Sequence, residues 1–390
     1  MSEVWVLTRQ GNRSAIEGFL RANALPNVHF AYCDLPFWGQ GSRKRSVNLH
    51  YYLWQFAAYL KARKLQRQVD FDVVHHVTYV RFWTPSFLSL LPVPFVWGPV
   101  GGGESVPACL WRSLSRRGRL YEICRDLARR LGHLDPFVRM TARRAALALA
   151  TTRDTERELR RLGCRQTKVW SEAALAGEEA QRLGQTPLRA GGPFRVISLG
   201  RLLEWKGFAL GLQAFEKFHR RHPESQYWII GDGPQRNRLE RAAREAGLRD
   251  AVKLWGRLER REVLAKLAQA DVLLHPSLHD SGGWVCLEAM AAGRPVVCLD
   301  LGGPGVQVTD ETGIKVGVVS AEQTIADLAG ALERLAASRE LRGELAARGR
   351  QRIEREFLWD KKAQLMMSLY HDAVCSSACS RPAVTTESVV

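Results

Sequence analysis

Two basic residues follow closely on a short apolar run in the second half of the chain. The run 195–199 is followed by Gly200, and Arg201 and Lys206 stand five residues apart just after it. If the run is a strand, the glycine permits a sharp turn and both cations lie beyond the strand's carboxyl end. Paired cations can stabilise the negative charge that develops on a departing diphosphate. A solvated loop between a strand and a helix would contain the same residues, so this segment alone is not decisive.

An acidic pair stands further along the chain. Gly282 and Gly283 open a predicted helix whose free amides and positive dipole end can hold a phosphate or a sugar hydroxyl. Asp280 lies just before this helix, and Glu288 lies eight residues later in mostly apolar surroundings. A carboxylate in such surroundings needs a hydrogen-bonding partner, and a ribose diol would supply one.

The first half of the chain offers weaker candidates. His75 and His76 end an apolar run, and side-chain alternation along a strand lets at most one of them reach a site. We favour His76, because Thr78 and Tyr79 continue the loop, although a buried and satisfied histidine is the commoner case. Glu104 follows a glycine-rich turn and is a candidate for binding a hydroxyl.

These residues need a frame of alternating strands and helices to position them. Apolar runs predict strands at 4–7, 73–77, 94–97, 145–150, 195–199, 226–230, 252–255, 272–275 and 295–299. Helical spacing predicts helices at 12–24, 120–144, 155–162, 208–221, 235–246, 260–269 and 284–292. Such alternation indicates parallel sheets, and the length of 390 residues suits two doubly wound α/β domains. Ligands of these folds gather at the carboxyl ends of the strands.

The order of these motifs resembles glycosyltransferase family 4. The resemblance rests on Gly200-Arg201 with Lys206-Gly207, on Gly231-Asp232-Gly233-Pro234, and on Asp280 with Glu288, and it covers nearly the whole second domain. It implies a GT-B fold, in which two Rossmann-like domains face each other across a cleft, and retaining transfer from a nucleotide sugar without an obligatory metal. We expect an acceptor-side domain at 1–183, a linker at 184–193, a donor-binding domain at 194–356, a helix returning to the first domain at 357–375, and a disordered tail at 376–390.

The resemblance also implies roles for single residues. Arg201 and Lys206 would hold the donor diphosphate, Asp280 the hydroxyls of the transferred sugar, and Glu288 the ribose. Further donor contacts would come from Gly200, Trp255, Arg257, Gly282, Gly283, Trp284 and Val285. Two positions depart from the family pattern: Asp280 stands where the family usually has Glu, and the turn before Glu104 replaces a histidine that many members carry. Asp70-Phe71-Asp72 is predicted to be a turn before a strand and not a metal site.

Charge points toward an anionic partner. The formal net charge is +17, and residues 112–168 carry sixteen Lys or Arg against six Asp or Glu. Such a field favours an anionic membrane surface, a lipid-linked phosphate or nucleic acid. The segment 120–144 could lie on an anionic inner leaflet, and an ordinary arginine-rich exterior is the alternative. With no signal peptide and no long apolar run, a cytoplasmic location is expected, peripheral on the inner membrane face if that segment binds lipid.

The resemblance therefore implies a retaining glycosyltransferase that needs no cofactor or metal. A UDP-sugar is the first expectation for the donor, and GDP- and ADP-sugars are the alternatives. The acceptor is expected to be a hydroxyl of a glycan or of a lipid-linked glycan. Other readings are a protein that binds nucleic acid or an anionic surface, a sugar phosphorylase, and a nucleotide-sugar epimerase. The basic stretch lacks a known nucleic-acid-binding motif, and no Gly-x-Gly-x-x-Gly of a dehydrogenase follows either first strand.

Overall fold

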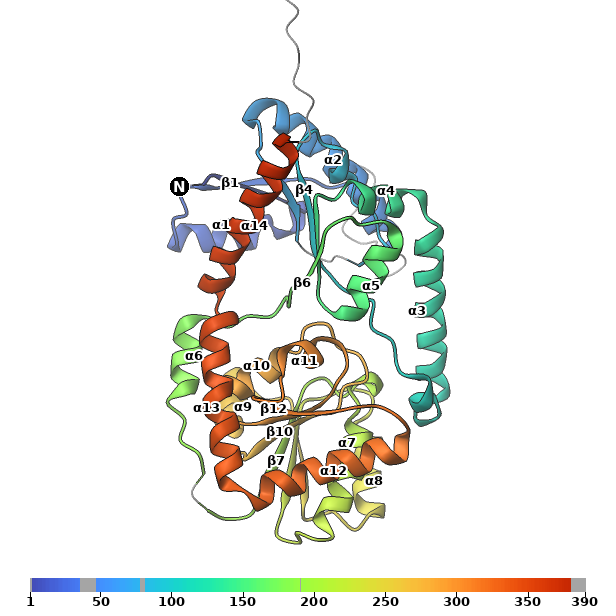
Figure 1. Cartoon of the computed structure of the whole chain (residues 1–390), viewed down its shortest axis with the longest axis vertical. Helices are drawn as coiled ribbons and strands as arrows, with labels where there is room; N and C mark the ends of the chain where they lie inside the picture. Colours follow the sequence, from blue (N-terminus) through green and yellow to red (C-terminus); the bar gives the residue numbers. More distant parts are fainter. Residues whose placement is uncertain (1, 36–46, 78–80, 190, 380–390) are drawn as a thin grey trace, which may run out of the picture.

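The computed structural model describes residues 2–35, 47–77, 81–189 and 191–379, and the chain folds into two α/β domains (Figure 1). The strands of the N-terminal domain are β1 (Val4–Thr8), β2 (Val28–Tyr32), β3 (Val74–His76), β4 (Phe95–Val100), β5 (Leu147–Ala150) and β6 (Thr167–Val169). Its helices are α1 (Arg13–Ala22), α2 (Val47–Val69), α3 (Arg116–Leu134), α4 (Pro136–Arg144) and α5 (Arg153–Leu162), with short 3-10 turns η1 (Gln10–Asn12), η2 (Phe87–Leu90) and η3 (Ala108–Ser113).

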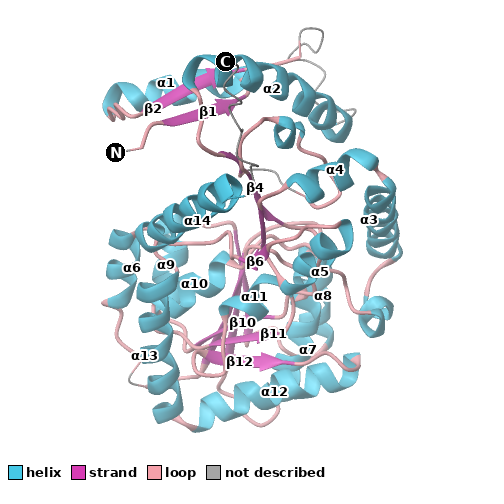
Figure 2. Ribbon diagram, turned by 45° about the horizontal axis from the view of Figure 1, so that its top comes forward, coloured by secondary structure: helices cyan, strands magenta, loops and turns pink. Residues whose placement is uncertain are grey.

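The C-terminal domain is a six-stranded parallel sheet with helices on both faces (Figure 2). Its strands are β7 (Arg195–Leu199), β8 (Gln226–Ile230), β9 (Val252–Gly256), β10 (Val272–His275), β11 (Val296–Leu299) and β12 (Gly313–Val316). The helices around it are α6 (Gly177–Gly184), α7 (Phe208–His219), α8 (Arg236–Glu245), α9 (Arg260–Ala268), α10 (Trp284–Ala291), α11 (Gly302–Gln307), α12 (Ala321–Ala337) and α13 (Arg339–Glu356), with the turn η4 (Glu204–Lys206).

The order of the strands determines where a ligand can bind in this sheet. The order is β12-β11-β10-β7-β8-β9, so the chain reverses its winding direction between β7 and β10. In open parallel sheets this reversal opens a crevice outside the carboxyl ends of the two strands. The loops after β7 and β10 contain the cations and the carboxylate that the sequence analysis selected.

The N-terminal sheet is divided into two parts. Strands β3, β4, β5 and β6 form one parallel sheet, and β1 and β2 form a separate parallel pair. The C-terminal helix α14 (Trp359–Cys379) covers the larger sheet, where Ala373 packs with Val96 and Leu149. The helix continues to Cys379, beyond the point where the sequence analysis placed a disordered tail, because no proline or glycine interrupts 359–379.

The segment 120–144, predicted as one helix, forms two helices, α3 and α4. Asp135 ends the first and caps the start of the second. The Asp135 carboxylate accepts hydrogen bonds from the amides of Phe137 at 2.8 Å and Val138 at 3.3 Å, and Pro136 occupies the first turn of α4. An aspartate cap followed by proline begins a new helix. Within the described part of the chain, no helix is both long enough and apolar enough to cross a bilayer.

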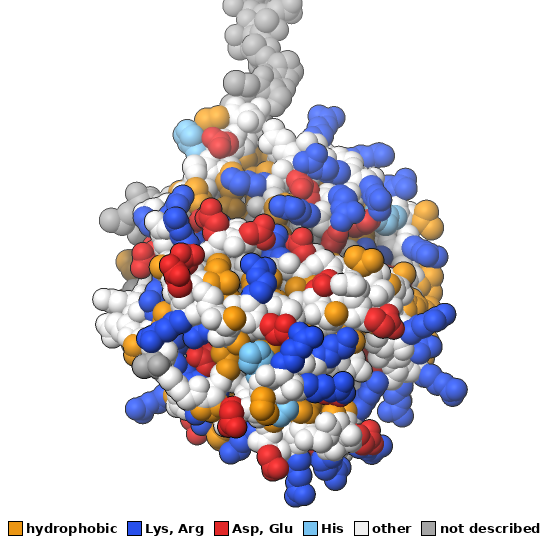
Figure 3. All heavy atoms as spheres, turned by 60° about the horizontal axis from the view of Figure 1, so that its bottom comes forward, with side chains coloured by type: hydrophobic (Ala, Val, Ile, Leu, Met, Phe, Trp, Pro, Cys, Tyr) orange, Lys and Arg blue, Asp and Glu red, His pale blue; other side chains and the backbone are white. Residues whose placement is uncertain are grey.

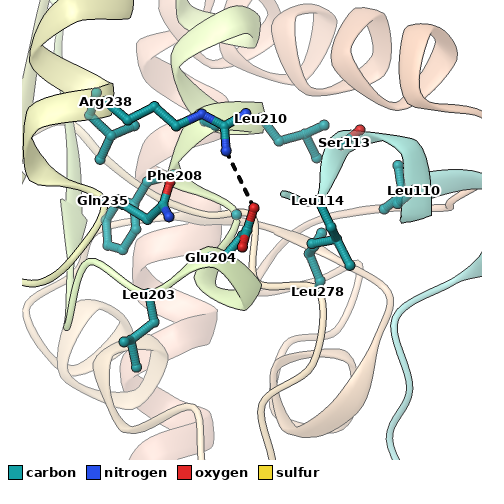
Figure 4. Close-up of a pocket in the computed structure, with 13 residues that line it drawn as sticks. Leu110, Ser113, Leu114, Leu203, Glu204, Phe208, Leu210, Gln235, Arg238 and Leu278 are labelled. Carbon is teal, nitrogen blue, oxygen red and sulfur yellow. Dashed lines mark hydrogen bonds and ion pairs between the residues drawn. The ribbon is translucent and has the colours of Figure 1, made fainter. Parts of the chain in front are cut away.

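A segment of the N-terminal domain packs into the core of the C-terminal domain. Val106, Leu110 and Leu114, around η3, belong to the same buried cluster as the α7 residue Phe215 of the C-terminal domain. Figure 4 shows Leu110, Ser113 and Leu114 facing α7 and α8 across a small pocket, beside the ion pair of Arg238 and Glu204. Helix α6, which the sequence analysis assigned to the N-terminal domain, buries Ala180 and Leu183 against the C-terminal domain. By packing, the boundary therefore lies before α6.

Candidate functional site

Lys206 and Asp280 form an ion pair at the point where the sheet reverses its winding. Gly207 brings their loops together: its φ is +69°, and a Cβ there would lie 1.9 Å from the Pro276 carbonyl oxygen. Only glycine permits this approach between the loops after β7 and β10. The Lys206 ammonium donates to Asp280 Oδ2, and the His275 Nε2 lies 3.3 Å from the same oxygen. The predicted cation and acid thus meet directly.

Asp280 is ionised although its side chain is largely shielded from solvent. Burial raises the pKa of Asp280, but the hydrogen bond from His275 and the charge of Lys206 outweigh it and hold that pKa well below its usual range. Burial lowers the pKa of His275, which Asp280 only partly offsets. Asp280 is therefore a carboxylate at neutral pH, able to accept hydrogen bonds from hydroxyl groups.

The start of α10 is held in place by the neighbouring helix α11. Gly283 caps α10 with φ +57°, and a Cβ there would lie 2.6 Å from the Gln307 Oε1. Gln307 donates to the Gly282 carbonyl and, at 3.1 Å, to the Ser171 hydroxyl. The Gly303 amide donates to the Asp280 carbonyl at 2.6 Å. The first amides of α10 are thereby fixed beside Asp280, where a helix N-terminus favours a negatively charged group.

Glu288 lies within α10 and has a protein partner that the sequence analysis did not foresee. Its Oε1 accepts a hydrogen bond at 2.6 Å from Arg260, at the start of α9, and Arg260 also pairs with Glu179 at 2.8 Å. Burial raises the pKa of Glu288, and the charge of Arg260 opposes the rise. Arg260 thus supplies a protein partner for one oxygen of this buried acid, and the contact of Glu288 with a ribose stays a prediction.

Glu172 is a residue at the junction that the sequence analysis missed. It follows β6 in the N-terminal domain, and its Oε1 accepts a hydrogen bond at 3.1 Å from the Ser281 hydroxyl of the C-terminal domain. Burial raises its pKa, and the neighbouring charges of Glu104 and Asp280 add to the rise. The signal in the sequence was an acid shortly after a strand end, but β6 itself was not predicted. A carboxyl group thus faces Asp280 and α10 from the opposite domain.

The other predicted donor contacts lie after β7, at the end of β9, just after β9, and at the start of α10. Arg201 and Arg257 are exposed after β7 and β9, and neither forms an ion pair with any residue that the structure describes. Gly200 follows β7 with φ +142°. Trp255 packs against Trp228, with ring centroids 5.7 Å apart. In α10, Val285 is half-buried, and the ring of Trp284 is exposed, 6.1 Å from that of Trp359. These roles stay predictions.

The two candidates from the N-terminal domain, Glu104 and His76, lie within hydrogen-bonding distance of neighbouring hydroxyl groups. Glu104 is 3% exposed and accepts hydrogen bonds from the hydroxyls of Thr152 at 2.8 Å and Thr155 at 3.1 Å. This network ties Glu104 to the start of α5. His76 Nε2 lies 3.0 Å from the Tyr51 hydroxyl. His75 contacts the Tyr370 hydroxyl at 2.6 Å, so it joins α14 to β3. Thr78 and Tyr79 lie outside the described residues.

Helix α3 reaches the site from the N-terminal domain. The ring of Trp205, in the loop after β7, stacks on Tyr121 at 5.0 Å and on His279 at 5.6 Å. His279 also contacts the Glu122 carboxylate at 2.9 Å. The loops that carry Lys206 and Asp280 are therefore held from outside by one helix. No group of three metal-ligating side chains occurs among the residues described.

Two Rossmann-like domains joined by a returning C-terminal helix define the GT-B architecture, and solved structures confirm it. A sucrose-phosphate synthase from Thermosynechococcus elongatus aligns with 96% of this chain and 100% of its own, at a TM-score of 0.61 and 18% identity. The Anabaena protein HepE, in complex with UDP and glucose, covers 98% of this chain with 100% of its own, at a TM-score of 0.55 and 17% identity. At such identities the likeness shows the fold.

Sequence comparisons show which class of enzyme the C-terminal half of the chain resembles. Residues 182–352 match the family described as Glycosyl transferases group 1, which is less than half of the chain. A glycogen synthase of Mycobacterium tuberculosis is 32% identical over 179 residues, which make up 46% of this chain and 42% of the relative. A 2-deoxystreptamine glucosyltransferase of Streptomyces kanamyceticus is 34% identical over 166 residues, 42% of each chain. This chain thus spans less than half the length of these relatives.

Proposed function

We propose that the protein is a glycosyltransferase that moves a sugar from a nucleotide sugar to a hydroxyl, with retention at the anomeric carbon. The observation that carries the proposal is the cluster of Lys206, Asp280 and His275 beside the start of α10. It lies at the crevice where the C-terminal sheet reverses its winding direction. The family match over residues 182–352 supports the same class of reaction.

In this mechanism the donor binds between the two loops. Its diphosphate displaces the Lys206 ammonium from Asp280, and Arg201 and the first amides of α10 supply further positive potential. The freed Asp280 carboxylate accepts hydrogen bonds from hydroxyls of the transferred sugar, while Glu288 binds the ribose through the oxygen that Arg260 does not hold. Positive charge that is already in place at the leaving group would be the largest contribution to the rate.

The bond changes follow from this placement. The acceptor oxygen bonds to the anomeric carbon on the face from which the diphosphate leaves, and the acceptor's proton passes to a phosphate oxygen. Glu172, from the facing domain, is placed to bind a hydroxyl of either sugar. No metal and no resident cofactor take part in this proposal.

A UDP-sugar is our first choice of donor, since HepE, with the same fold, binds UDP and glucose, and GDP- and ADP-sugars remain to be compared. We take the acceptor to be a glycan or a lipid-linked glycan. The second candidate reading is a protein that binds an anionic surface or nucleic acid without transfer, which the net charge of +17 favours. A sugar phosphorylase or an epimerase would use the same fold and would need phosphate or no acceptor.

The test is a panel of UDP-, GDP- and ADP-sugars, measured for binding by calorimetry and for slow hydrolysis. The expected result is that one donor binds and is hydrolysed to a sugar with the donor's anomeric configuration, and that Glu288→Ala loses binding. Glu333→Ala is the matched control, because Glu333 also pairs with an arginine, Arg221, outside the crevice. If no nucleotide sugar binds while the protein is folded and binds nucleic acid, the second reading replaces the first.

A further inference from the structure

Helix α3 has its charged and apolar faces reversed relative to an ordinary surface helix. On its inner face, Glu122 is buried, and the side chains of Arg125 and Arg129 are only 11% and 13% exposed. Large apolar side chains on the same helix are 52% to 72% exposed, namely Leu120, Ile123, Leu127, Leu131 and Leu134. Surface helices normally turn such residues toward the core.

The spacing puts these apolar side chains on one stripe. At the helical period, Leu120, Ile123, Leu127, Leu131 and Leu134 fall within an arc of about 80°. Exposed arginines border the stripe: Arg116 lies at its N-terminal end, and Arg117 and Arg130 lie on either side of it. Residues 116–144 contain nine arginines against three acids. In Figure 3, orange hydrophobic side chains lie among blue Lys and Arg along the right-hand edge, the side on which Figure 1 places α3.

Helix α2 repeats the pattern. Leu49, Leu53, Phe56 and Leu60 are 42% to 53% exposed and fall within an arc of about 60° of the helix. The same helix contains four Lys or Arg and no acid.

The two stripes adjoin. The Tyr52 hydroxyl of α2 donates to Asp135, the residue after Leu134, at 2.9 Å. Phe87 joins α2 to α4, the helix that follows α3: its ring lies 5.7 Å from that of Phe56 and 5.3 Å from that of Phe137. We name the stripes of α2 and α3, with Phe137, the outer apolar face. Such a contiguous apolar surface on a folded protein marks an interaction site.

We propose that the outer apolar face docks on an anionic lipid bilayer. A stripe of exposed leucines bordered by arginines matches the chemistry of a membrane interface, where acyl chains lie below anionic headgroups. The whole chain's charge of +17 adds attraction for such a surface and opposes association of two copies of this chain. The proposal goes beyond the transfer reaction, since it concerns a surface outside the donor site.

Docking in this orientation would have a consequence for the site. The inner face of α3 contacts the loops after β7 and β10 through Tyr121 and Glu122. The helix that lies on the lipid is therefore the helix that holds the site from outside. A lipid-linked acceptor would meet the domain junction without leaving the membrane plane.

The experiment is co-sedimentation of the full chain with phosphatidylcholine vesicles, with and without phosphatidylglycerol, in the absence of any donor or acceptor. We expect binding that requires phosphatidylglycerol and weakens with salt. The double variant Leu127→Gln and Leu131→Gln should weaken binding by at least about tenfold, because two leucine side chains lose their burial. Arg116→Gln with Arg130→Gln should lower it by about fivefold for each charge removed.

Val319→Gln is the matched control, since Val319 is 76% exposed in the C-terminal domain and should bind as the wild type does. Unchanged melting temperatures confirm that the variants are folded. Wild-type binding by the leucine variant, or no binding to anionic vesicles at low salt, overturns the proposal. Sedimentation velocity without lipid provides a further outcome: a dimer that the leucine variant dissociates would make this face an interface between copies and overturn lipid docking. Because no substrate is present, failure of this proposal leaves the transfer reaction untouched.

Discussion

Replacing Lys206 by alanine separates its role in catalysis from its role in stability. In the structure, the Lys206 and Asp280 side chains are 21% and 16% exposed, so the ion pair is largely shielded from solvent. Its removal leaves Asp280 with the His275 contact at 3.3 Å. Loss of one hydrogen bond between charged groups costs about 2 kcal/mol. For a domain of this size that corresponds to a fall of about 4 to 8 °C in melting temperature.

The effect on turnover should be much larger than the effect on folding. If Lys206 stabilises the departing diphosphate, kcat should fall about 100- to 1000-fold, the range found when one such electrostatic group is removed. The assay is steady-state transfer or donor hydrolysis below the lowered melting temperature, beside Lys315→Ala, whose lysine is 19% exposed and also paired. Lys206→Arg should recover part of kcat. A stable Lys206→Ala protein with wild-type kcat would refute the assignment of Lys206 to the leaving group.

Three further predictions concern ionisable groups. Burial lowers the pKa of His75 from 6.5 to about 4, so the unfolded chain binds a proton there that the folded protein does not. The free energy of unfolding should therefore fall as the pH drops from about 6.5 to about 4, by up to about 3 kcal/mol. Denaturant titrations of His75→Gln should lose this dependence on pH. A His75 pKa near 6.5, measured by NMR in the folded protein, would contradict the prediction. Since burial raises the pKa of Glu172, the acid limb of kcat/KM should move to lower pH in Glu172→Gln, with about a tenfold loss at neutral pH, and an identical profile would remove Glu172 from the reaction. Glu288→Gln should weaken binding of the nucleotide about tenfold, while a 2′,3′-dideoxynucleotide binds wild type and variant alike; equal losses for both ligands would mean that Glu288 does not contact the ribose.

Local patterns predicted five of the six strands of the C-terminal sheet, and β12 was not predicted. The strands at 195–199, 226–230 and 272–275 have the predicted bounds, because strands buried on both faces of a parallel sheet are continuous apolar runs between helices. In the N-terminal domain, β2 and α2 were not predicted. Strand β2 contains His29 among half-buried residues, and α2 turns several apolar side chains outward, so neither pattern separates a core face from a solvent face.

The same contrast applies to the candidate site. The sequence by itself located Lys206 and Asp280 in loops after strand ends and Glu288 in the helix that follows, since glycines, strand ends and helical spacing are local features. Only the tertiary structure decided that Lys206 pairs with Asp280, that Arg260 compensates Glu288, and that Glu172 faces α10 from the other domain. These partners stand 74, 28 and 109 residues apart, and no short-range pattern encodes which charges meet across a sheet reversal or a domain junction. The packing of η3 and α6 into the C-terminal core could not be predicted from the sequence for the same reason. A short apolar segment does not specify which core will bury it.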